Sequence, residues 1–583
     1  MSAASAGPTA ADLLEPVIRA ARDAGERLRE EFFRPTGPRG ERGKAPVDTE
    51  IEESLRATLQ SLLAGSFLGE ETGLAAGPIG QYRWVVDPHD GTNEFLKGNR
   101  GSAVSIALLR GARFSDSAPE AGAAKAEVAL GVVHCPLAPD RGPDTIAWAQ
   151  GCGPIRRNGR PLEVDLSRAR LERGAIVWTT ASAALRPHAF SRALAPARFV
   201  AMPSIAYRLA RIAAGDGAAT LSLHSVNEYD IAAGAALVRA AGGVLHDAEG
   251  REIAFTGARD ALVPGCIAGA PDAVRDLAGK DWESVLREPR IAPRMALGFP
   301  RSADDARLAR AQGCLLGQLI GDSLGSRVGF QIAGQPAAAG ELALALARSI
   351  ARHRRYDASA AFAAYQDWLA SGPFDVGGTT RAGISGKPDP GSTSSGSLMR
   401  VSPIGIWAAG DPARAARAAR EDSALTHPNP VCLEACAGYA AAIGAGVAGG
   451  TRADMLAAAL AHCGGEARAA IGRASQGARP GDRASRLDRV LVALQNAFYQ
   501  LHHARSFEAA LIATASAGGD TDSHGAVAGA LAGALHGRTA IPQRWLLSVL
   551  SCRPSADCGV SQARPTAYWP DDVLDLAEGL IAA

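Results

Sequence analysis

The stretch Trp84-Val85-Val86-Asp87-Pro88-His89-Asp90-Gly91-Thr92 decides how this chain is expected to fold and act. Its three apolar residues predict a short buried strand. The strand ends in two carboxylates, Asp87 and Asp90, that can be aimed at one point, and Gly91 and Thr92 then turn backbone N–H groups toward it. Hard divalent cations prefer oxygen ligands, and Mg²⁺ in particular shares them with substrate phosphate. The stretch therefore predicts a strand end that holds a cation and a phosphate group together.

Two other stretches of the N-terminal half carry acidic residues suited to the same kind of site. Gly69-Glu70-Glu71-Thr72 lies upstream, and Asn227-Glu228-Tyr229-Asp230 opens a predicted helix downstream. Taken singly, the three acidic stretches would be a solvated loop, a turn and a helix N-cap. Taken together, they favour a multi-metal phosphate site. Glu71 is left open between support of that site and plain solvation.

These stretches resemble the signatures of the inositol monophosphatase-like, lithium-sensitive, Mg²⁺-dependent phosphatases. The family signatures are Gly-Glu-Glu, Asp-Pro-x-Asp-Gly-Thr and Trp-Asp-x-Ala-Ala-Gly, and the chain has all three in order, with Tyr229 in place of Trp. The resemblance covers roughly residues 10 to 275. It implies an α+β layered sandwich and a phosphomonoesterase that hydrolyses a small phosphorylated metabolite by metal-activated water. The substrate would be an inositol phosphate, a sugar phosphate or a nucleoside bisphosphate.

Carried over onto the matching positions, the resemblance implies a site with two or three Mg²⁺ ions. The implied metal ligands are the side chains of Glu70, Asp87, Asp90 and Asp230 and the backbone carbonyl of His89. The His89 side chain would then matter little. The implied catalytic residues are Glu70, Asp90 and Thr92, of which Thr92 would orient the attacking water. The amides of Gly91 and Thr92, at a helix N-terminus, would bind phosphate oxygens.

Two further regions bear on this site. Near residue 47, relatives carry a Pro-Val-Thr-x-x-Asp element, whereas this chain has Ala45-Pro46-Val47-Asp48-Thr49-Glu50-Ile51. In an ungapped match the acidic position falls on an isoleucine, but Asp48 or Glu50 lies close enough to substitute, so the third metal is left open. Ser204 and Arg208 lie where relatives line the substrate pocket. Arg208 is expected either to bind a second phosphate of the substrate or to lie on a helix surface.

Bulk composition narrows the class of protein. At 583 residues the chain is too long for one ordinary core and should hold two or more domains. The 61 basic and 60 acidic residues nearly balance, which argues against a nucleic-acid partner. Nine scattered cysteines without a CxxC framework indicate reduced thiols and a cytoplasmic protein. The N-terminus predicts an amphipathic helix rather than a signal peptide, and no stretch approaches the ~20 apolar residues that span a bilayer.

The pattern of apolar residues changes along the chain. In the N-terminal half, strand-like segments at 103–109 and 128–133 alternate with helix-like segments at 204–214 and 231–241. The pattern loosens over residues 276–307, and beyond it nearly every segment has helical periodicity. We therefore expect a layered α+β domain over residues 1–297 and an all-α domain over residues 298–583. The Gly/Ser/Pro-rich stretch 383–396 predicts a long loop between helices.

The C-terminal half resembles a second family, the ADP-ribosylglycohydrolases, over roughly residues 305 to 550. The motifs that carry this resemblance are Gly313-Cys314-Leu315-Leu316-Gly317, Gly321-Asp322-Ser323-Leu324-Gly325, Gly396-Ser397-Leu398-Met399-Arg400, Thr426-His427-Pro428 and Gly518-Gly519-Asp520-Thr521-Asp522-Ser523. The resemblance implies an all-helical fold with a two-metal centre. One half of that centre would be formed by Asp520, Asp522 and Ser523.

The other half of that centre is missing from the sequence. Relatives carry a Thr-Asp-Asp triad where this chain has Ala337-Ala338-Ala339, and the family's Glu and Asn are replaced by Gly329 and Ser395. We therefore expect at most a single, weakly bound Mg²⁺ or Mn²⁺ and impaired catalysis. Two alternatives stay open for this half. One is an active glycohydrolase that releases ADP-ribose, which would make the protein bifunctional, and the other is a non-catalytic ADP-ribose-binding or dimerisation module, with a homodimer left open.

Overall fold

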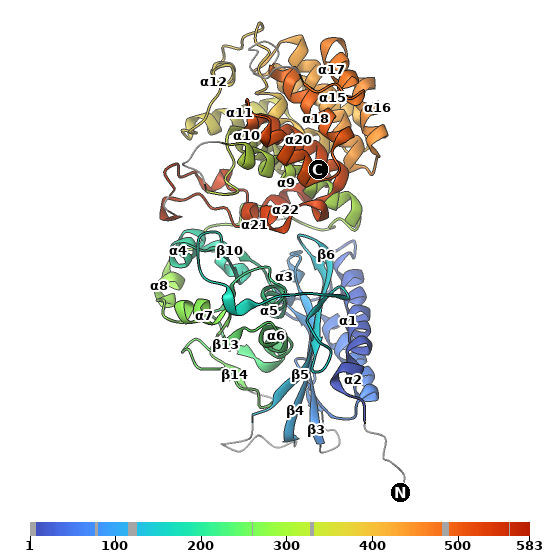
Figure 1. The fold of residues 1–583 in the computed structure, drawn as a ribbon, viewed down its shortest axis with the longest axis vertical. Coiled ribbons are helices and arrows are strands. Elements are labelled where there is room, and N and C mark those ends of the chain that lie inside the picture. Colours follow the sequence, from blue (N-terminus) through green and yellow to red (C-terminus); the bar gives the residue numbers. More distant parts are fainter. Residues whose placement is uncertain are drawn as a thin grey trace. The chain divides into compact units, whose positions relative to one another are not determined.

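The computed structural model of the chain describes residues 7–75, 80–114, 125–258, 261–295, 297–326, 332–480, 489–558 and 560–583. The chain forms two compact units (Figure 1). Unit 1 consists of Met1–Pro293 and Gly298–Arg301, and unit 2 of Arg294–Leu297 and Ser302–Ala583. The chain thus alternates between the units over residues 294–301, and the boundary at residue 298 stays a prediction.

Unit 1 is built on an eight-stranded sheet. Its strands are β1 (Ser66–Gly69), β2 (Gly73–Ala75), β3 (Gly80–Asp90), β4 (Ala103–Phe114), β5 (Glu127–Ala138), β6 (Gly142–Ala149), β7 (Arg156–Arg157) and β8 (Arg160–Pro161). Their order is β2-β1-β3-β4-β5-β6-β7-β8, with β1 parallel to β3 and the other neighbours antiparallel. Helices α1 (Ala10–Phe32) and α2 (Pro46–Leu62) bury their apolar stripes in one core with the strands. The other face is covered by α5 (Ile205–Ala213) and α6 (Glu228–Ala240), as Figure 1 shows.

A smaller sheet completes unit 1. Its strands are β9 (Ile176–Thr179), β10 (Arg198–Ala201), β11 (Ala219–Ser222), β13 (Val244–His246) and β15 (Cys266–Gly269), in the order β10-β9-β11-β15-β13. Helix α4 (Pro187–Leu194) lies between β9 and β10 in the chain, and α7 (Pro271–Ala278) and α8 (Trp282–Arg287) follow β15. The short strand β12 (Val226–Asn227) pairs with β14 (Leu262–Val263). The expected loosening of the chain from residue 276 is therefore wrong in part, because α8 lies within that stretch. The layered α+β fold itself is confirmed.

Unit 2 is helical, and no strand occurs in the parts of it that are described. Its α-helices are α9 (Asp305–Gly325), α10 (Ala338–His353), α11 (Ala358–Ala370), α12 (Gly378–Ile384), α13 (Ser402–Trp407), α14 (Pro412–Ala424), α15 (Pro430–Val447), α16 (Arg452–His462), α17 (Gly465–Ser475), α18 (Arg489–His503), α19 (Phe507–Ser516), α20 (Thr521–His536), α21 (Gln543–Leu550) and α22 (Val573–Ile581). The expected all-α fold is confirmed. The loop predicted from residue 383 begins after α12 and runs to a 3₁₀ turn at Leu398–Arg400.

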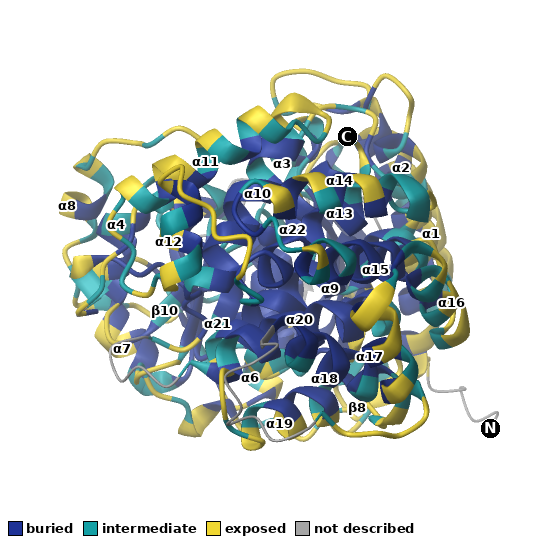
Figure 2. Cartoon of the chain, turned by 90° about the horizontal axis from the view of Figure 1, so that it is seen from above, coloured by how far each residue is buried: buried dark blue, intermediate teal, exposed yellow. Residues whose placement is uncertain are grey.

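Glycines let α9 and α20 pack backbone to backbone in the core of unit 2. Gly313, Gly317 and Gly321, each four residues apart on α9, face Gly533, Gly529 and Gly525 on α20. A Cβ atom added at any of the six would collide with a backbone carbonyl of the opposite helix. Residues four apart share one face of a helix, so the two glycine stripes form one continuous contact. Figure 2 shows both helices in the dark blue of buried residues.

One helix departs from what the hydropathy of the sequence led us to expect. Of the described residues, α15 alone is long and apolar enough to cross a membrane by length and composition, with a mean hydropathy of 1.4. Of that window, 72% is buried within the protein, which is also true of core helices. The expectation that no segment approaches the length and apolar composition of a membrane-spanning helix is therefore wrong for α15.

Candidate active site

The carboxylates of Asp87 and Asp90 lie at the end of β3, where the pairing with β4 is irregular. Asp87 pairs with Ser105 and Asp90 with Ala103, and the register shifts between the two pairs. In a regular strand, side chains three residues apart point to opposite faces. The irregularity re-aims one of them, so that both carboxylates can serve one site. Gly91 then adopts a left-handed φ of 104° and starts the short helix α3 (Thr92–Leu96).

The Asp90 carboxylate is held by the first turn of α5. Its Oδ2 accepts the Ser204 hydroxyl at 2.6 Å and the Ala206 N–H at 2.7 Å. Ser204 is also the N-cap of α5, since its Oγ accepts the Tyr207 N–H at 2.9 Å. The N-terminus of this helix therefore fixes the orientation of Asp90.

Glu70 and Asp230 reach the same place from other elements. Glu70 follows β1, the parallel neighbour of β3, and its N–H donates to the Val86 carbonyl at 3.2 Å. Its carboxyl hydrogen-bonds to Asp87. Asp230 lies in the first turn of α6, where its Oδ2 accepts the Asn227 N–H at 2.7 Å. Asp230 can therefore both cap the N-terminus of α6 and belong to the group of carboxylates at the end of β3.

The four carboxylates lie close enough to repel one another. Burial raises the pKa of Asp87 well above its ordinary value, and Glu70, Asp90 and Asp230 act in the same direction. Burial likewise raises the pKa of Asp230 well above its usual range, with Asp90 and Glu70 adding to the shift. Surrounding protein raises the pKa of Glu70 to about 7, although the residue keeps an exposed surface. The pKa of Asp90 is also raised by burial, against the hydrogen bonds from α5.

This donor set fits a hard divalent cation in its chemistry. Four side chains with oxygen donors lie close together, and a bound cation would reduce the electrostatic repulsion among their carboxylates. The geometry is less complete, because no group of three or more His, Cys, Asp or Glu side chains in the described ranges has the arrangement of a metal site. Asp90 and Asp230 instead turn oxygens toward backbone N–H groups. The role of these side chains as metal ligands stays a prediction.

The structure distinguishes the two candidates for the additional acidic group. Asp48 is buried, and its Oδ2 accepts the Thr92 hydroxyl at 3.2 Å. Glu50 is exposed and forms ion pairs with Arg27 and Arg39 at 3.5 and 3.4 Å. Asp48 therefore belongs to the site, and Glu50 points away from it. Both lie in the first turns of α2, and only the inward face of that helix reaches β3.

Arg208 does not extend into open space as a substrate ligand would. Its guanidinium is fully buried and donates to the Ser204 carbonyl at 3.2 Å, the Leu221 carbonyl at 2.6 Å and the Thr220 hydroxyl at 3.3 Å. The sequence led us to expect either a phosphate ligand or a helix-surface arginine, and the buried position of Arg208 differs from both. Arg208 lies on the inward face of α5, where its charge lowers the pKa of Asp90 against the effect of burial.

Sequence reasoning missed the carboxylate that shapes the Glu70 loop. Glu52 is fully buried and accepts the N–H groups of Glu71 and Thr72 at 2.9 and 2.7 Å. Glu52 lies four residues after Asp48 on α2, so a helical reading of this segment would have placed both on one face. Glu71 has its pKa raised, by burial first and then by Asp48 and Glu52. It therefore lies beside the site, although the residue keeps an exposed surface.

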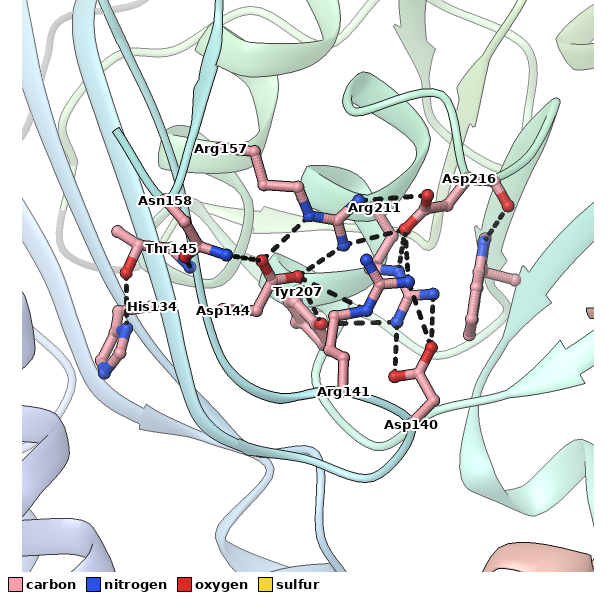
Figure 3. A network of polar contacts seen from close by, with 11 residues as sticks. His134, Asp140, Arg141, Asp144, Thr145, Arg157, Asn158, Tyr207, Arg211 and Asp216 are labelled. Carbon is pink, nitrogen blue, oxygen red and sulfur yellow. Dashed lines mark hydrogen bonds and ion pairs between the residues drawn. The ribbon is translucent and has the colours of Figure 1, made fainter. Parts of the chain in front are cut away.

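The far end of α5 is fixed by a buried ion network, drawn in Figure 3. Arg211 donates to both oxygens of Asp140, at 3.0 and 2.9 Å, and its side chain has no exposed surface. The Tyr207 hydroxyl donates to Asp144 at 2.7 Å. Asp140 and Asp144 lie at the turn between β5 and β6 and in β6. The network thus anchors to the large sheet the same helix whose first turn holds Asp90.

In unit 2, two of the three predicted ligands on α20 lie together. Asp520 and Asp522 hydrogen-bond to each other, and burial together with Asp520 raises the pKa of Asp522 to about 6. Ser395 donates to Asp520 at 3.4 Å. The Ser523 hydroxyl instead contacts the Met399 sulfur at 3.4 Å, so it does not join the carboxylates.

Opposite these carboxylates, the alanines that stand in place of the triad offer no ligand atom, whereas the pKa values of Asp322 and Asp375 are raised first by burial and then by the charge of Asp522. Residues 337–339 are alanines at the start of α10, and Asp322 Oδ2 accepts the N–H groups of Ala337 and Gly340 at 2.7 and 2.8 Å. The other oxygen of Asp322 has no hydrogen-bond partner among the described residues. Gly329, the predicted site of a lost glutamate, lies outside the described residues. The alanines at 337–339 therefore remove the ligand atoms that the triad would supply.

Two family profiles match the sequence. The profile of the inositol monophosphatase family matches residues 10–286, and that of ADP-ribosylglycohydrolase matches residues 303–578. An inositol-1-monophosphatase of Mesorhizobium japonicum is 31% identical over 254 residues, which make up 41% of this chain and 86% of that protein. The Nus factor SuhB of Escherichia coli is 27% identical over 276 residues, 45% of this chain and 93% of that protein.

A further relative and two solved structures match parts of the chain. An ADP-ribosyl-[dinitrogen reductase] glycohydrolase of Rhodospirillum rubrum is 28% identical over 216 residues, 35% of this chain and 70% of that protein. Among solved structures, an ADP-ribosylglycohydrolase-related protein complex matches with 24% identity and a TM-score of 0.38, covering 47% of this chain and 98% of that chain. The extragenic suppressor protein suhB of Bartonella henselae matches with 24% identity and a TM-score of 0.36, with the same coverage.

Proposed function

The chain belongs to the inositol monophosphatase family through its N-terminal half and carries an ADP-ribosylglycohydrolase domain in its C-terminal half, and from this premise we propose that it is a Mg²⁺-dependent phosphomonoesterase. The observation that carries the proposal is the convergence of Glu70, Asp87, Asp90 and Asp230 at the end of β3. The substrate would be a small phosphorylated metabolite. Burial raises the pKa of all four carboxylates, and the charge of Asp90 raises the pKa of Asp87, Asp230 and Glu70 further, which a bound cation would offset.

Each part of the site has a task in phosphate ester hydrolysis. Bound Mg²⁺ would neutralise the phosphate oxygens, lower the pKa of water and stabilise the leaving alkoxide. Glu70, Asp87, Asp90, Asp230 and the carbonyl of His89 would hold it. The amides of Gly91 and Thr92 would bind the phosphate.

The chain's own residues would also handle the proton of the attacking water. The Thr92 hydroxyl lies 3.2 Å from Asp48 and 2.8 Å from the His89 carbonyl. When it donates to Asp48, an oxygen lone pair of Thr92 is left to accept a hydrogen bond from water. Such positioned acceptors typically contribute about 10²–10⁴-fold to rate. Asp48 would thus act through Thr92 as the base that draws the proton away.

The test is a phosphate-release screen with full-length protein over inositol phosphates, sugar phosphates, nucleoside bisphosphates and ADP-ribose phosphates. We expect release that depends on Mg²⁺, is lost with chelator and is inhibited by Li⁺. Asp90→Asn should abolish it, while Asp276→Asn, on the exposed surface of α7, should not. Activity that persists after complete removal of metal would contradict the proposal.

For the C-terminal half we propose an impaired domain that retains at most a single, weakly held Mg²⁺ or Mn²⁺ at Asp520 and Asp522. The alanines at 337–339 support this, because they remove the ligands of one half of the centre. Full-length protein should release no ADP-ribose from ADP-ribosylated protein with Mg²⁺ or Mn²⁺. Metal-dependent release that survives Asp90→Asn but not Asp522→Asn would instead establish the second candidate, a glycohydrolase.

A further inference from the structure

We propose that the side chain of His89 positions Asp48, and through it Thr92, for the hydrolysis that the site is proposed to perform. His89 Nδ1 lies 2.7 Å from Asp48 Oδ1, and both side chains are buried. The other oxygen of Asp48 accepts the Thr92 hydroxyl. The inference rests on the proposed phosphatase function and assigns His89 a task that its backbone carbonyl does not perform.

The hydrogen bonds around the imidazole fix which nitrogen carries the proton. A carboxylate can only accept, so His89 Nδ1 must donate to Asp48. In the neutral ring, Nε2 then accepts from the Ser102 hydroxyl, which lies 3.1 Å away. The relay therefore runs from Ser102 to His89 to Asp48, and Thr92 donates to Asp48 from the other side.

Packing holds the imidazole in the plane that this relay needs. The Phe95 ring contacts it edge to face, with ring centroids 4.3 Å apart and an interplanar angle of 88°. The imidazole has no exposed surface, so water cannot replace it as a donor to Asp48. Without His89, one oxygen of a buried carboxylate would lose its donor and the carboxylate would be free to rotate.

Rotation of Asp48 matters because Thr92 has a second acceptor. The Thr92 hydroxyl has one proton and lies 2.8 Å from the His89 carbonyl and 3.2 Å from Asp48. Only a correctly placed Asp48 competes for that proton and leaves the Thr92 lone pairs directed at water. His89 is thus a positioning residue for Asp48, in the way that outer partners orient catalytic groups.

Kinetics of four single variants and one double variant test this role. His89→Leu should lower kcat by about 10- to 100-fold, while KM and the Mg²⁺ concentration for half activation stay within about twofold. His89→Asn, whose amide nitrogen takes the place of Nδ1, should recover most of kcat, and His89→Gln should not. Asp48→Asn should lower kcat further, and adding His89→Leu to it should change little, because both act through one path.

Several outcomes would overturn the proposal. They are a His89→Leu enzyme with the wild-type kcat, no rescue by His89→Asn, or losses that multiply in the double variant. A wild type without any Mg²⁺-dependent phosphate release overturns the phosphatase function and this role with it. An active wild type with an unaffected His89→Leu variant overturns the role of His89 alone.

A measurement without catalysis guards against misfolded variants. Long-range ¹H–¹⁵N spectra of the full chain report the tautomer of each of the 12 histidines, and His89→Asn identifies the signals of His89. We expect a proton on Nδ1 and a change in its shift in Asp48→Asn. A neutral ring protonated on Nε2 would overturn the relay whatever the kinetics show.

Discussion

The Glu52 carboxylate accepts the Thr72 N–H at 2.7 Å and the Thr72 hydroxyl at 2.6 Å. It also accepts the N–H of Glu71, and it lies so close to Gly69 that a Cβ atom there would collide with it. The buried Glu52 carboxylate on α2 therefore contacts the backbone on both sides of Glu70. The position of Glu70 is set by a residue that need not touch substrate.

Replacing Glu52 should therefore weaken the site and the fold together. Glu52→Gln turns an amide NH₂ toward backbone N–H donors and leaves at least one of them unpaired, at a cost of about 1–3 kcal/mol. Urea unfolding of unit 1 should show this loss, and more Mg²⁺ should be needed for activity. The matched control is Glu53→Gln, whose side chain is exposed and whose effect should stay within about 0.5 kcal/mol. Equal behaviour of the two variants would disprove the role of Glu52.

Mg²⁺ should stabilise unit 1 against heat, because a cation relieves the repulsion among the four carboxylates. At 100 times its dissociation constant, the expected gain is about 2.7 kcal/mol. Asp87→Asn should shift stability in the opposite sense, raising that of the metal-free protein and removing most of the response to Mg²⁺. Calorimetry with Mg²⁺ and with chelator measures both effects. A wild-type Tm that is the same in both conditions would contradict the metal site.

The ion network of Figure 3 should make unit 1 sensitive to acid. Although burial acts to raise it, the charges of Arg141 and Arg211 hold the pKa of Asp140 below its usual value, and Arg157 has the largest lowering effect on Asp144. Since the folded-state pKa values lie below the unfolded value of about 3.9, the stabilisation is complete above about pH 5 and is lost as the pH falls. Urea midpoints at pH 7 and pH 3.5 measure the loss.

A variant isolates the contribution of the network. Asp140→Asn leaves Arg211 short of a partner and should cost about 3–5 kcal/mol at pH 7, with a smaller cost at pH 3.5. Arg287→Gln breaks the exposed pair with Glu283 and should cost at most about 1 kcal/mol at either pH. The network would have no special role if the two variants proved equally stable.

The glycine contact between α9 and α20 should tolerate no side chain. Gly321→Ala places a methyl group against the Gly525 carbonyl and should destabilise unit 2 by about 3 kcal/mol as the helices separate. Gly472 on α17 is a matched control, because nothing lies within 4 Å of an added Cβ atom there. Gly472→Ala should stabilise the unit by up to about 1 kcal/mol through helix propensity. Circular dichroism during thermal unfolding distinguishes the two signs.

The sequence allowed the fold of both units to be predicted, because the periodicity of apolar residues changes from mixed to helical between them. The family resemblance also predicted that Glu70, Asp87, Asp90 and Asp230 share one site. The effects of their charges on the pKa values of Asp87 and Asp230 are consistent with it, and their role as metal ligands stays a prediction. Their positions are local in part, since Glu70 follows β1, Asp90 ends β3 and Asp230 lies in the first turn of α6.

What sequence could not predict are contacts that depend on which way a side chain turns. Arg208 was expected at a pocket wall or on a surface, and the structure buries it, with its guanidinium donating to the Leu221 carbonyl of β11. The His89 side chain was expected to matter little, and it contacts Asp48, which lies 41 residues away in the chain. Ser523 was expected beside Asp522, yet its hydroxyl contacts a methionine. Tertiary packing, rather than motif spacing, decides each of these.

Helix α5 connects the Asp90 carboxylate with the ion network around Arg211. Its first turn supplies both donors to Asp90, and its last turn is fastened to the sheet by Arg211. Random mutagenesis followed by a screen for inactive clones should therefore return lesions around Arg211 that leave every candidate ligand intact. The proteins from such clones would be soluble and folded but would bind Mg²⁺ weakly, and an excess of added Mg²⁺ should restore their activity.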